Sequence, residues 1–495
     1  MAEYYRFIYR IVDIRASDKD EYITISDAAN HGMRVVINKA GKKARDNEQL
    51  MDVTYDASIT NEIRLYVMAG NDHVIINTPN SDIKLRIVGT NGEKSYEVQN
   101  SDKKVIIYGR TDSINFLGKT SKISKRLAND TSNTHFVTTN PYNVWKPLIN
   151  GEVNKDDGFL FGLGFKYTGM DGFRKLPYST VQEVMITHSF ETNAFSLNYN
   201  GQWMQAIGKA DITVNALIDA PNNTMNFFGR GDGTVLDKTG DYHEFYRTRF
   251  DYYTFAPALR WHTGKGSTFS FGPALQLYHL DPDDNTGRII SHPGLLNSYD
   301  STTVDKEKVH LGFIANFISN KKNDNILPSK GYDLDIKMEG YGGLNSYSRS
   351  YFQIRPEFEY FLRTDTAGIF VLSDRIGGGI SIGSPAFYQS MFLGGQGNLL
   401  GFLKNRFAGQ DMVFNDFQAR LRLASIPGYI LPGQFGVSGF FDTGRVWVQG
   451  DNSDKFHYGT GGGLYFAPAS LTVLQVLAGH SVEGWYPYIV FNFRF

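Results

Sequence analysis

The chain has 495 residues, a formal net charge of −1 at pH 7 and no cysteine. The missing cysteines exclude disulfides, thiolate metal ligands and cysteine nucleophiles, and the near-zero charge gives no field that favours nucleic acid. Aromatic residues make up 14% of the sequence and glycine contributes 51 residues, a composition typical of membrane β-barrels. No run of about 18 apolar residues occurs, so the sequence predicts no membrane-spanning helix.

Residues 1–140 predict a small, all-β periplasmic domain, and residues 111–155 read as a polar linker that could include one short helix. The opening residues lack the basic and then apolar pattern of a signal peptide, so we expect a mature or trimmed chain. Short alternating runs separated by Gly and Asn turns predict the strands of this domain. They lie at 21–26, 34–37, 62–67, 72–77, 83–88 and 104–108.

Two turns of this domain, A-G-N-D (69–72) and G-T-N-G-E-K (89–94), resemble the glycine–aspartate calcium turns of β-helical repeats. The full nine-residue repeat is missing, and we therefore interpret both segments as ordinary Gly/Asn turns.

Residues 156–495 predict a sixteen-stranded antiparallel transmembrane β-barrel. The run that begins at Asp157 places Phe159, Leu163 and Phe165 on one face. Arg355, Glu357 and Glu359 would be costly in a dry core but suit a water-filled lumen. About sixteen alternating runs can be counted, an even number, as in bacterial barrels. Longer segments at 220–243, 281–306 and 383–412 predict extracellular loops.

The last stretch, 485–495, predicts the closing strand of the barrel. Its large apolar residues recur at every second position, which places one face of the strand toward lipid. Pro487 cannot donate a hydrogen bond to a neighbouring strand, so it should weaken the seam between the first and last strands. The apolar positions are Ile489, Phe491, Phe493 and Phe495.

Three motifs in the barrel half resemble the outer-membrane protein 85 superfamily, the BamA/TamA-type assembly and translocation barrels. N-I-L-P-S-K-G-Y (325–332) resembles a P-x-x-G strand entry. F-L-G-G-Q-G-N-L-L-G-F-L-K-N-R-F-A-G (392–409) resembles the family's lumenal loop, which carries an R-G-F/Y tripeptide. F-F-D-T-G-R-V-W (440–447) matches the F-x-D-x-G strand through Phe440, Asp442 and Gly444.

The resemblance implies that Asp442 faces the lumen and anchors an arginine of the loop. Leu400 stands at the arginine position, directly before Gly401 and Phe402. Because a buried carboxylate needs a cation, we expect Arg406 to take this role, with Arg445 and Lys404 as weaker candidates.

The N-terminal part does not resemble the β-α-α-β-β POTRA repeats of typical members. Y-Y-R-F-I-Y-R-I-V-D (4–13) and T-N-E-I-R-L-Y (60–66) are similar to the segment between a calcineurin-like phosphoesterase domain and the barrel in fused envelope proteins of the Bacteroidota. This similarity implies that the chain is the carboxy-terminal part of a longer protein.

No segment predicts catalysis, a cofactor or a metal site in this chain. G-I-S-I-G (379–383) has the spacing of a nucleophile elbow, but Ser381 lies in a continuing strand pattern with no helix after it. D-P-D-D-N-T-G (281–287) lacks the glycine of a calcium loop, and G-K-G-S-T (264–268) falls in a turn between strands. We therefore expect a protein that is not an enzyme.

Two functions remain open from the sequence. The first is assembly, insertion or translocation of proteins at the outer membrane, with lipids and other outer-membrane proteins or lipoproteins as partners and no nucleic acid. The second is a membrane anchor or passive channel that supports a periplasmic, phosphoesterase-like domain or a surface partner. The missing loop arginine favours the second, and the family motifs favour the first.

Overall fold

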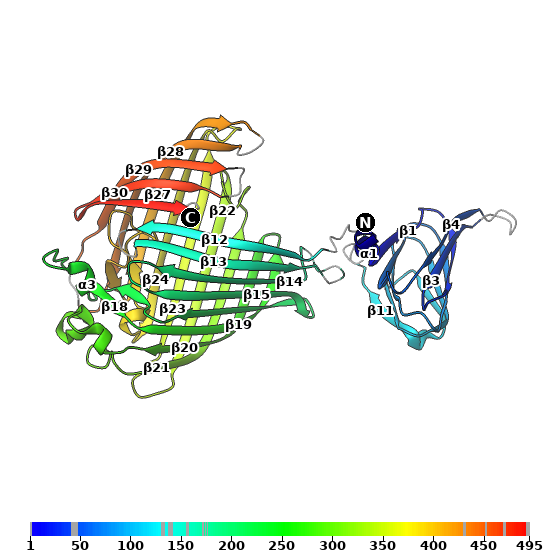
Figure 1. The fold of residues 1–495 in the computed structure, drawn as a ribbon, viewed down its shortest axis with the longest axis horizontal. Helices are drawn as coiled ribbons and strands as arrows, with labels where there is room; N and C mark the ends of the chain where they lie inside the picture. Colours follow the sequence, from blue (N-terminus) through cyan, green and yellow to red (C-terminus); the bar gives the residue numbers. More distant parts are fainter. Residues whose placement is uncertain are drawn as a thin grey trace. The chain divides into compact units, whose positions relative to one another are not determined.

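The computed structural model describes residues 2–40, 48–129, 134–136, 142–154, 158–170, 173, 175, 177–428, 432–450, 453–468 and 472–491. The chain divides into two compact units, Met1–Pro141 and Tyr142–Phe495, and each is described by itself (Figure 1). None of the helices within the described ranges is long and apolar enough to cross a bilayer, a finding that concerns helices alone.

The N-terminal unit is built from short strands that form two sheets. Its elements are α1 (Ala2–Ile8), β1 (Ile11–Arg15), β2 (Glu21–Asp27), β3 (Met33–Lys39), β4 (Gln49–Tyr55), β5 (Glu62–Val67), β6 (Asp72–Thr78), β7 (Lys84–Gly89), β8 (Lys94–Ser101), β9 (Val105–Gly109), β10 (Ile114–Gly118), a 3-10 turn (Thr120–Lys122) and β11 (Ile123–Leu127). The six strands predicted from the sequence are present as β2, β3, β5, β6, β7 and β9. Two further strands, β10 and β11, lie in the segment that we predicted to be a linker.

From β5 onward, consecutive strands alternate between the two sheets. One sheet has the order β1-β5-β7-β9-β11 and the other β10-β8-β6-β2-β3-β4. All neighbours in the first sheet are parallel, and so are β2, β6, β8 and β10 in the second. The chain therefore winds in coils, and each coil adds one strand to each sheet.

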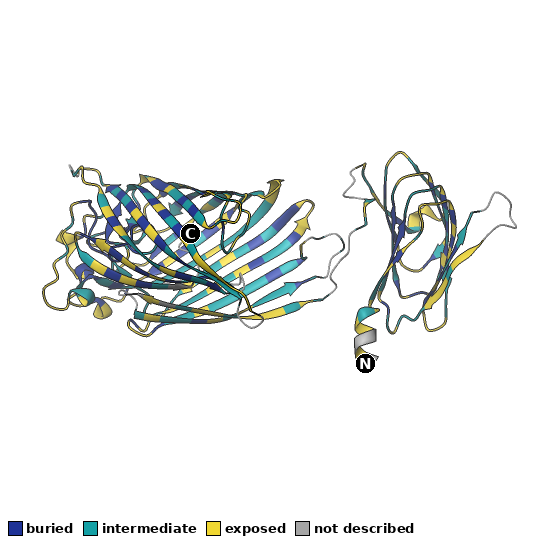
Figure 2. Ribbon diagram, turned by 90° about the horizontal axis from the view of Figure 1, so that it is seen from above, coloured by how far each residue is buried: buried dark blue, intermediate teal, exposed yellow. Residues whose placement is uncertain are grey.

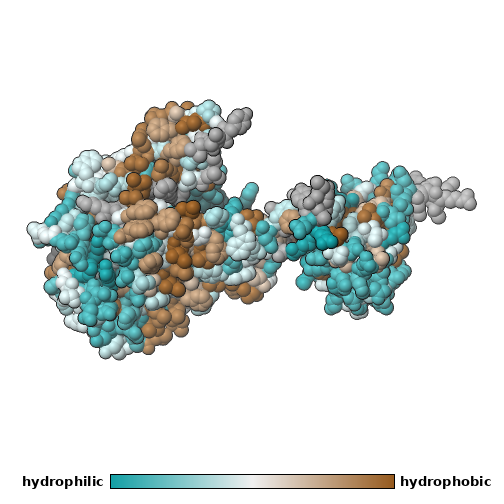
Figure 3. Space-filling view, in the orientation of Figure 1, coloured by the Kyte–Doolittle hydropathy of each residue, from teal (hydrophilic) through white to brown (hydrophobic). Residues whose placement is uncertain are grey.

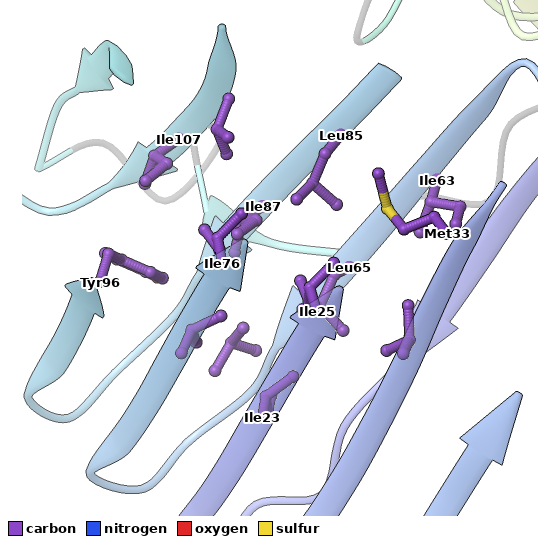
Figure 4. Close-up of a cluster of buried hydrophobic side chains, with 14 of the residues drawn as sticks. Ile23, Ile25, Met33, Ile63, Leu65, Ile76, Leu85, Ile87, Tyr96 and Ile107 are labelled. Atoms are coloured by element: carbon purple, nitrogen blue, oxygen red, sulfur yellow. The ribbon is translucent and has the colours of Figure 1, made fainter. Parts of the chain in front are cut away.

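The core of this unit lies between the two sheets. Ile23 and Ile25 of β2 and Ile63 and Leu65 of β5 are fully buried, and Figure 4 shows them within one cluster of apolar side chains. In β2 the intervening Thr24 is exposed, as expected for a strand with one buried face. In β5 the intervening Arg64 is also buried and forms an ion pair with Glu62 at 2.7 Å.

The two turns with a calcium-like sequence pack against each other. A Cβ atom at Gly92, whose φ is +92°, would lie 2.0 Å from the Gly70 carbonyl oxygen, so only glycine permits this approach. Lys94 Nζ donates to Asp72 Oδ2 at 2.6 Å, to the Asn91 carbonyl at 2.9 Å and to the Gly70 carbonyl at 2.5 Å. The cation between these turns is therefore a lysine of the chain itself.

The second unit is a closed barrel of sixteen strands (Figure 1). In chain order the strands are β12 (Val144–Asn154), β13 (Gly158–Gly169), β14 (Thr180–Ser189), β15 (Phe195–Ile207), β16 (Ala210–Asp219), β19 (Asp251–Gly264), β20 (Ser267–His279), β21 (Lys308–Asn320), β22 (Gly331–Gly343), β23 (Tyr351–Arg363), β24 (Phe370–Gly383), β27 (Asp411–Ile426), β28 (Gly433–Trp447), β29 (His457–Pro468), β30 (Leu474–Ser481) and β31 (Gly484–Phe491). The predicted all-β class and strand number are confirmed. The predicted start near residue 156 is wrong, because β12 begins at Val144 inside the proposed linker.

The barrel wall separates apolar from charged residues. Leu163 is 52% exposed and Leu423 is 56% exposed on the outer face, and Figure 2 shows the alternation of burial along the strands. Figure 3 shows hydrophobic residues gathered in a band across the barrel. On the inner face, Arg355 donates to Glu339 Oε1 at 2.5 Å and Arg375 to Asp416 Oδ2 at 2.6 Å. These ion pairs give the barrel a charged lumen.

The three long connections lie at one end of the barrel, opposite the end where β12 begins. Each of them follows a strand that runs in the same direction as β12, because antiparallel neighbours alternate in direction. They are residues 220–250, 280–307 and 384–410, called the plug loops below. The longer elements within them are β17 (Thr224–Asn226), α3 (Tyr242–Tyr246), β18 (Arg247–Arg249), β25 (Met391–Leu393) and β26 (Phe407–Gly409).

Candidate functional site: the lumenal loop and the barrel seam

The tip of the third plug loop lies against the inner wall of the last strands. The backbone N–H of Leu400 donates to Asp442 Oδ2 at 2.8 Å, and that of Gly401 donates to the Tyr488 hydroxyl at 3.1 Å. The Ser481 hydroxyl donates to the Gly401 carbonyl. The tip thus contacts β28, β30 and β31, the strands that lead to the carboxy-terminus.

Glycine permits this close approach on both sides of the contact. Gly401 has a φ of +90°, and a Cβ atom there would lie 2.9 Å from the backbone of His480. A Cβ atom at Gly459 of β29 would lie 1.8 Å from the Leu400 carbonyl oxygen. Phe402, the next residue of the loop, is 1% exposed and packs edge-on against Phe407.

The structure places Phe440, Asp442 and Gly444 together on the inner face of β28, the side that the alternation predicts. Asp442 is fully buried, while its neighbour Phe441 is 46% exposed on the outer face. Gly444 leaves space for Leu393, because a Cβ atom there would lie 2.7 Å from the end of that side chain.

The expected pairing of Arg406 with Asp442 is wrong. Arg406 Nε donates to Glu483 Oε1 at 2.6 Å, and its other nitrogens donate to the Thr234 hydroxyl at 2.8 Å and the Thr234 carbonyl at 2.6 Å. The chain turns between Gly401 and Arg406, so the arginine points toward the β30–β31 turn instead of β28. Arg445, a weaker candidate, donates to the Ser453 carbonyl.

The first plug loop connects the other two, through residues that the sequence did not single out. Arg230 is 7% exposed and donates to the Ser390 hydroxyl at 2.8 Å and the Pro385 carbonyl at 2.7 Å. Its own backbone N–H donates to the Leu296 carbonyl at 3.0 Å. Burial lowers the pKa of Arg230 to about 10, against the opposing effect of Asp300. The sequence feature that could have indicated Arg230 is its position between two glycines, G-R-G (229–231).

Asp232 joins this loop to the start of β29. It accepts hydrogen bonds from His457 Nε2 at 2.9 Å and the Ser453 hydroxyl at 2.7 Å. Burial acts to raise the pKa of Asp232, but these hydrogen bonds outweigh it, so the pKa lies below its usual value. The His457 ring also stacks on Phe407, with ring centroids 3.6 Å apart.

Together the plug loops and the inner wall form one apolar cluster at this end of the barrel. Phe227, Leu296, Phe387 and Leu400 belong to it, and each is at most 1% exposed. A polar cavity of about 490 Å³, lined by tyrosine, glutamine and charged side chains, lies in the lumen beside the third plug loop.

The β21–β22 turn, at the other end, also reaches across the lumen. Gly331 begins β22 with a φ of +115°, which agrees with the predicted strand entry. Ile326 and Leu327 of this turn pack on Tyr465 and Val473, and Arg420 donates to the Pro328 carbonyl. The turn thus contacts the wall formed by β27 and β29.

The seam joins β12 and β31, the first and last strands of the barrel. Among the described residues these strands pair at one position, Val153 with Ile489. By contrast, β12 pairs with β13 at every position from Val144 to Asn154. Pro487 is exposed in β31, opposite Ala478 of β30. The described part of β31 extends to Phe491, and the other two predicted seam residues, Phe493 and Phe495, lie outside the described residues.

Within the part of the chain that the structure describes, no group of three or more His, Asp or Glu side chains is arranged to hold a metal ion.

Comparisons with known proteins agree with this architecture. Residues 115–470 match the Omp85 superfamily domain. The chain is similar to BamA from Haemophilus ducreyi lacking POTRA domains 1-3, with 11% identity, a TM-score of 0.51 and 71% of each chain covered. This likeness shows the fold. No curated protein sequence matches the chain.

Two further solved structures resemble the chain at lower TM-scores. CdiB from Escherichia coli has 12% identity and a TM-score of 0.46, with 76% of this chain and 66% of that chain covered. CdiB from Acinetobacter baumannii has 12% identity and a TM-score of 0.44, with 71% and 59% covered. The chain thus spans less than two thirds of either CdiB chain.

Proposed function

Because the chain belongs to the Omp85 superfamily and is an outer-membrane β-barrel, we propose that it assists the assembly, insertion or translocation of proteins at the bacterial outer membrane. The observation that carries the proposal is the seam of the sixteen-stranded barrel, where the first and last strands, β12 and β31, meet at Val153 and Ile489.

Opening of this seam would have a direct physical consequence. Backbone N–H and C=O groups that lack a partner strand are costly in lipid and form a template for another strand. An incoming strand of a client protein can satisfy them by pairing with β12 or β31, which is β-strand addition. The partners are then other outer-membrane proteins, accessory lipoproteins and the surrounding lipids.

The proposal also sets the orientation of the protein. We place the N-terminal unit in the periplasm and the plug loops outside the cell. Gly401, Phe402 and Asp442 brace the wall beside the seam through the contacts of the loop tip.

The proposal is tested by depletion of the protein and measurement of the other outer-membrane barrels. Their levels should fall, and unchanged levels would contradict an assembly role. A covalent tether sharpens the test, since the chain has no native cysteine. V153C/I489C should close the seam under oxidising conditions and stop assembly until a reductant is added. V476C/I489C joins the same Ile489 position to its β30 partner and should leave assembly unchanged.

A membrane anchor or passive channel is the second candidate. Two observations favour it. The backbone N–H of Leu400 donates to Asp442, whereas the family has an arginine at this position, and the N-terminal unit consists of two sheets of mainly parallel strands. In this case the barrel holds a phosphoesterase-like domain or a surface partner, as in fused proteins of the Bacteroidota. Depletion would then leave other barrels at normal levels and release that partner from the outer-membrane fraction.

A further inference from the structure

We propose that Arg406 and Glu483 form a latch that holds the seam closed from inside the barrel. The physiological meaning of an open seam rests on the proposed function, but the latch itself is a property of the barrel.

The position of Glu483 is the first step of the argument. It lies in the tight turn between Ser481, the last residue of β30, and Gly484, the first residue of β31. Because β31 is one side of the seam, any outward movement of this strand at its plug end must move Glu483.

The second step is the environment of the ion pair. The side chain of Arg406 is 3% exposed and that of Glu483 is 12% exposed. The guanidinium lies over the rings of Phe228 and Phe407, at 5.0 and 4.5 Å from their centroids. The second carboxylate oxygen of Glu483 is buried without a hydrogen-bond partner in the described part of the chain. Separating the two side chains would leave charges without compensation, which strongly opposes opening.

The third step is that the same hairpin is bound to the plug at further points. Lys238 Nζ donates to the Glu483 carbonyl, and the Tyr488 hydroxyl donates to the Phe402 carbonyl at 3.2 Å. Among the described residues, β31 thus pairs with β30 along its length and also contacts the plug through Tyr488.

The latch also connects the seam to the first plug loop. Arg406 donates to both the hydroxyl and the carbonyl of Thr234, which fixes the guanidinium on its side facing away from Glu483. A displacement of the loop around Thr234 would therefore release Arg406 and weaken its hold on Glu483. In this way the seam can respond to events at the plug end of the barrel.

The test measures seam opening directly in the purified full-length protein in lipid nanodiscs. Cysteines introduced at Val153 and Ile489 carry spin labels, and the absence of native cysteine keeps other positions unlabelled. Pulsed EPR then gives the fraction of molecules with a widened seam. E483Q keeps the shape of the side chain and removes its charge, and should raise the open-to-closed ratio about tenfold, or about 1.4 kcal/mol.

Further variants distinguish loss of the Arg406–Glu483 latch from a general destabilisation of the barrel. R406Q should match E483Q, whereas R406K, which keeps the charge, should open the seam less. E244Q breaks the Arg288–Glu244 pair, at 2.9 Å in the first two plug loops, and should leave the seam distance unchanged. A heat-modifiable gel shift verifies that each variant is folded. Unchanged distances in E483Q and R406Q, or equal opening in E244Q, would overturn the latch.

The outcome is independent of client proteins because the assay contains none. If depletion left other barrels at normal levels while E483Q opened the seam, the latch would stand and the assembly function would fail. If depletion lowered those levels while E483Q left the seam closed, the reverse would hold.

Discussion

Apolar and polar residues alternate along the strands of both the N-terminal unit and the barrel. The apolar side chains point into the N-terminal unit, but they point outward from the barrel. Ile23 and Ile25 point into the first unit and are fully buried. In the barrel, Leu163 and Leu423 point outward and are more than half exposed, while charged residues such as Arg355 and Glu339 pair inside. The period alone thus predicts a strand, and the solvent on each side decides which face is apolar.

The two regions also bury ion pairs of different kinds. Lys94 and Asp72 lie on neighbouring parallel strands and are fixed by the turns on either side. Arg406 and Glu483 come from a loop and a turn 77 residues apart, with no shared strand pairing. The first pair is part of the architecture, whereas the second can separate while the barrel stays closed elsewhere.

The largest expected loss of stability comes from breaking the Lys94–Asp72 ion pair of the N-terminal unit. K94A leaves the buried carboxylate of Asp72 without its cation and should lower the free energy of unfolding of the N-terminal unit by about 3–5 kcal/mol. Pulse proteolysis in urea measures this loss. K94M/D72L replaces both charges by apolar groups and should recover most of it. A loss below about 1 kcal/mol in K94A would show that the pair is not structural.

The outward orientation of the apolar face of the barrel strands is tested by L163R. A guanidinium on the lipid side should lower the free energy of barrel folding into vesicles by about 2–4 kcal/mol if Leu163 lies near the membrane centre. Asn215 lines the lumenal cavity, and N215R should have little effect. Equal losses in the two variants would contradict the assignment of faces.

The pH dependence of stability tests the buried carboxyl group of Asp72 in the N-terminal unit. Burial raises the pKa of Asp72 to about 6 from 3.8, against the opposing effect of Lys94. The folded unit therefore binds this proton more tightly than the unfolded chain, and stability should fall as the pH rises from 4.5 to 6.5, by about 2 kcal/mol. Urea titrations at these pH values measure the slope, and D72N should remove the part due to Asp72; burial also raises the pKa of Asp13, which acts in the same direction. The lowered pKa of Glu62 acts below this window.

The sequence was sufficient for the barrel and for the inner face of β28. Long strands with aromatic outer positions carry a periodic signal, and Phe440, Asp442 and Gly444 follow it. The sequence did not predict β12, because its alternation is weak. Pro147 and Gly151 interrupt its large outward-facing residues, which are Trp145, Ile149 and Val153.

Loop contacts could not be predicted in the same way. Strand parity fixes the side on which Asp442 lies, but no period governs the path of the chain from Gly401 to Arg406. The partners of Arg406 are Thr234 and Glu483, far apart in the sequence and brought together by barrel closure. The parallel winding of the N-terminal unit was missed for a related reason, because its neighbouring strands pair with partners one full coil away.

The smallest expected effect concerns Asp442. Its hydrogen bond joins a loop, as the Arg406–Glu483 pair does, to a strand of the barrel wall. D442N keeps an oxygen that can accept the Leu400 N–H but removes the charge, and should weaken the loop tip by about 1 kcal/mol. D442L removes the acceptor and leaves that N–H unpaired, which should cost about 1–3 kcal/mol. Protease sensitivity of residues 392–409 and the temperature of the gel shift measure both changes. If D442L matched the unaltered protein, the contacts of Gly401 with Tyr488 and Ser481 would be enough to hold the tip, and Asp442 would not anchor the loop.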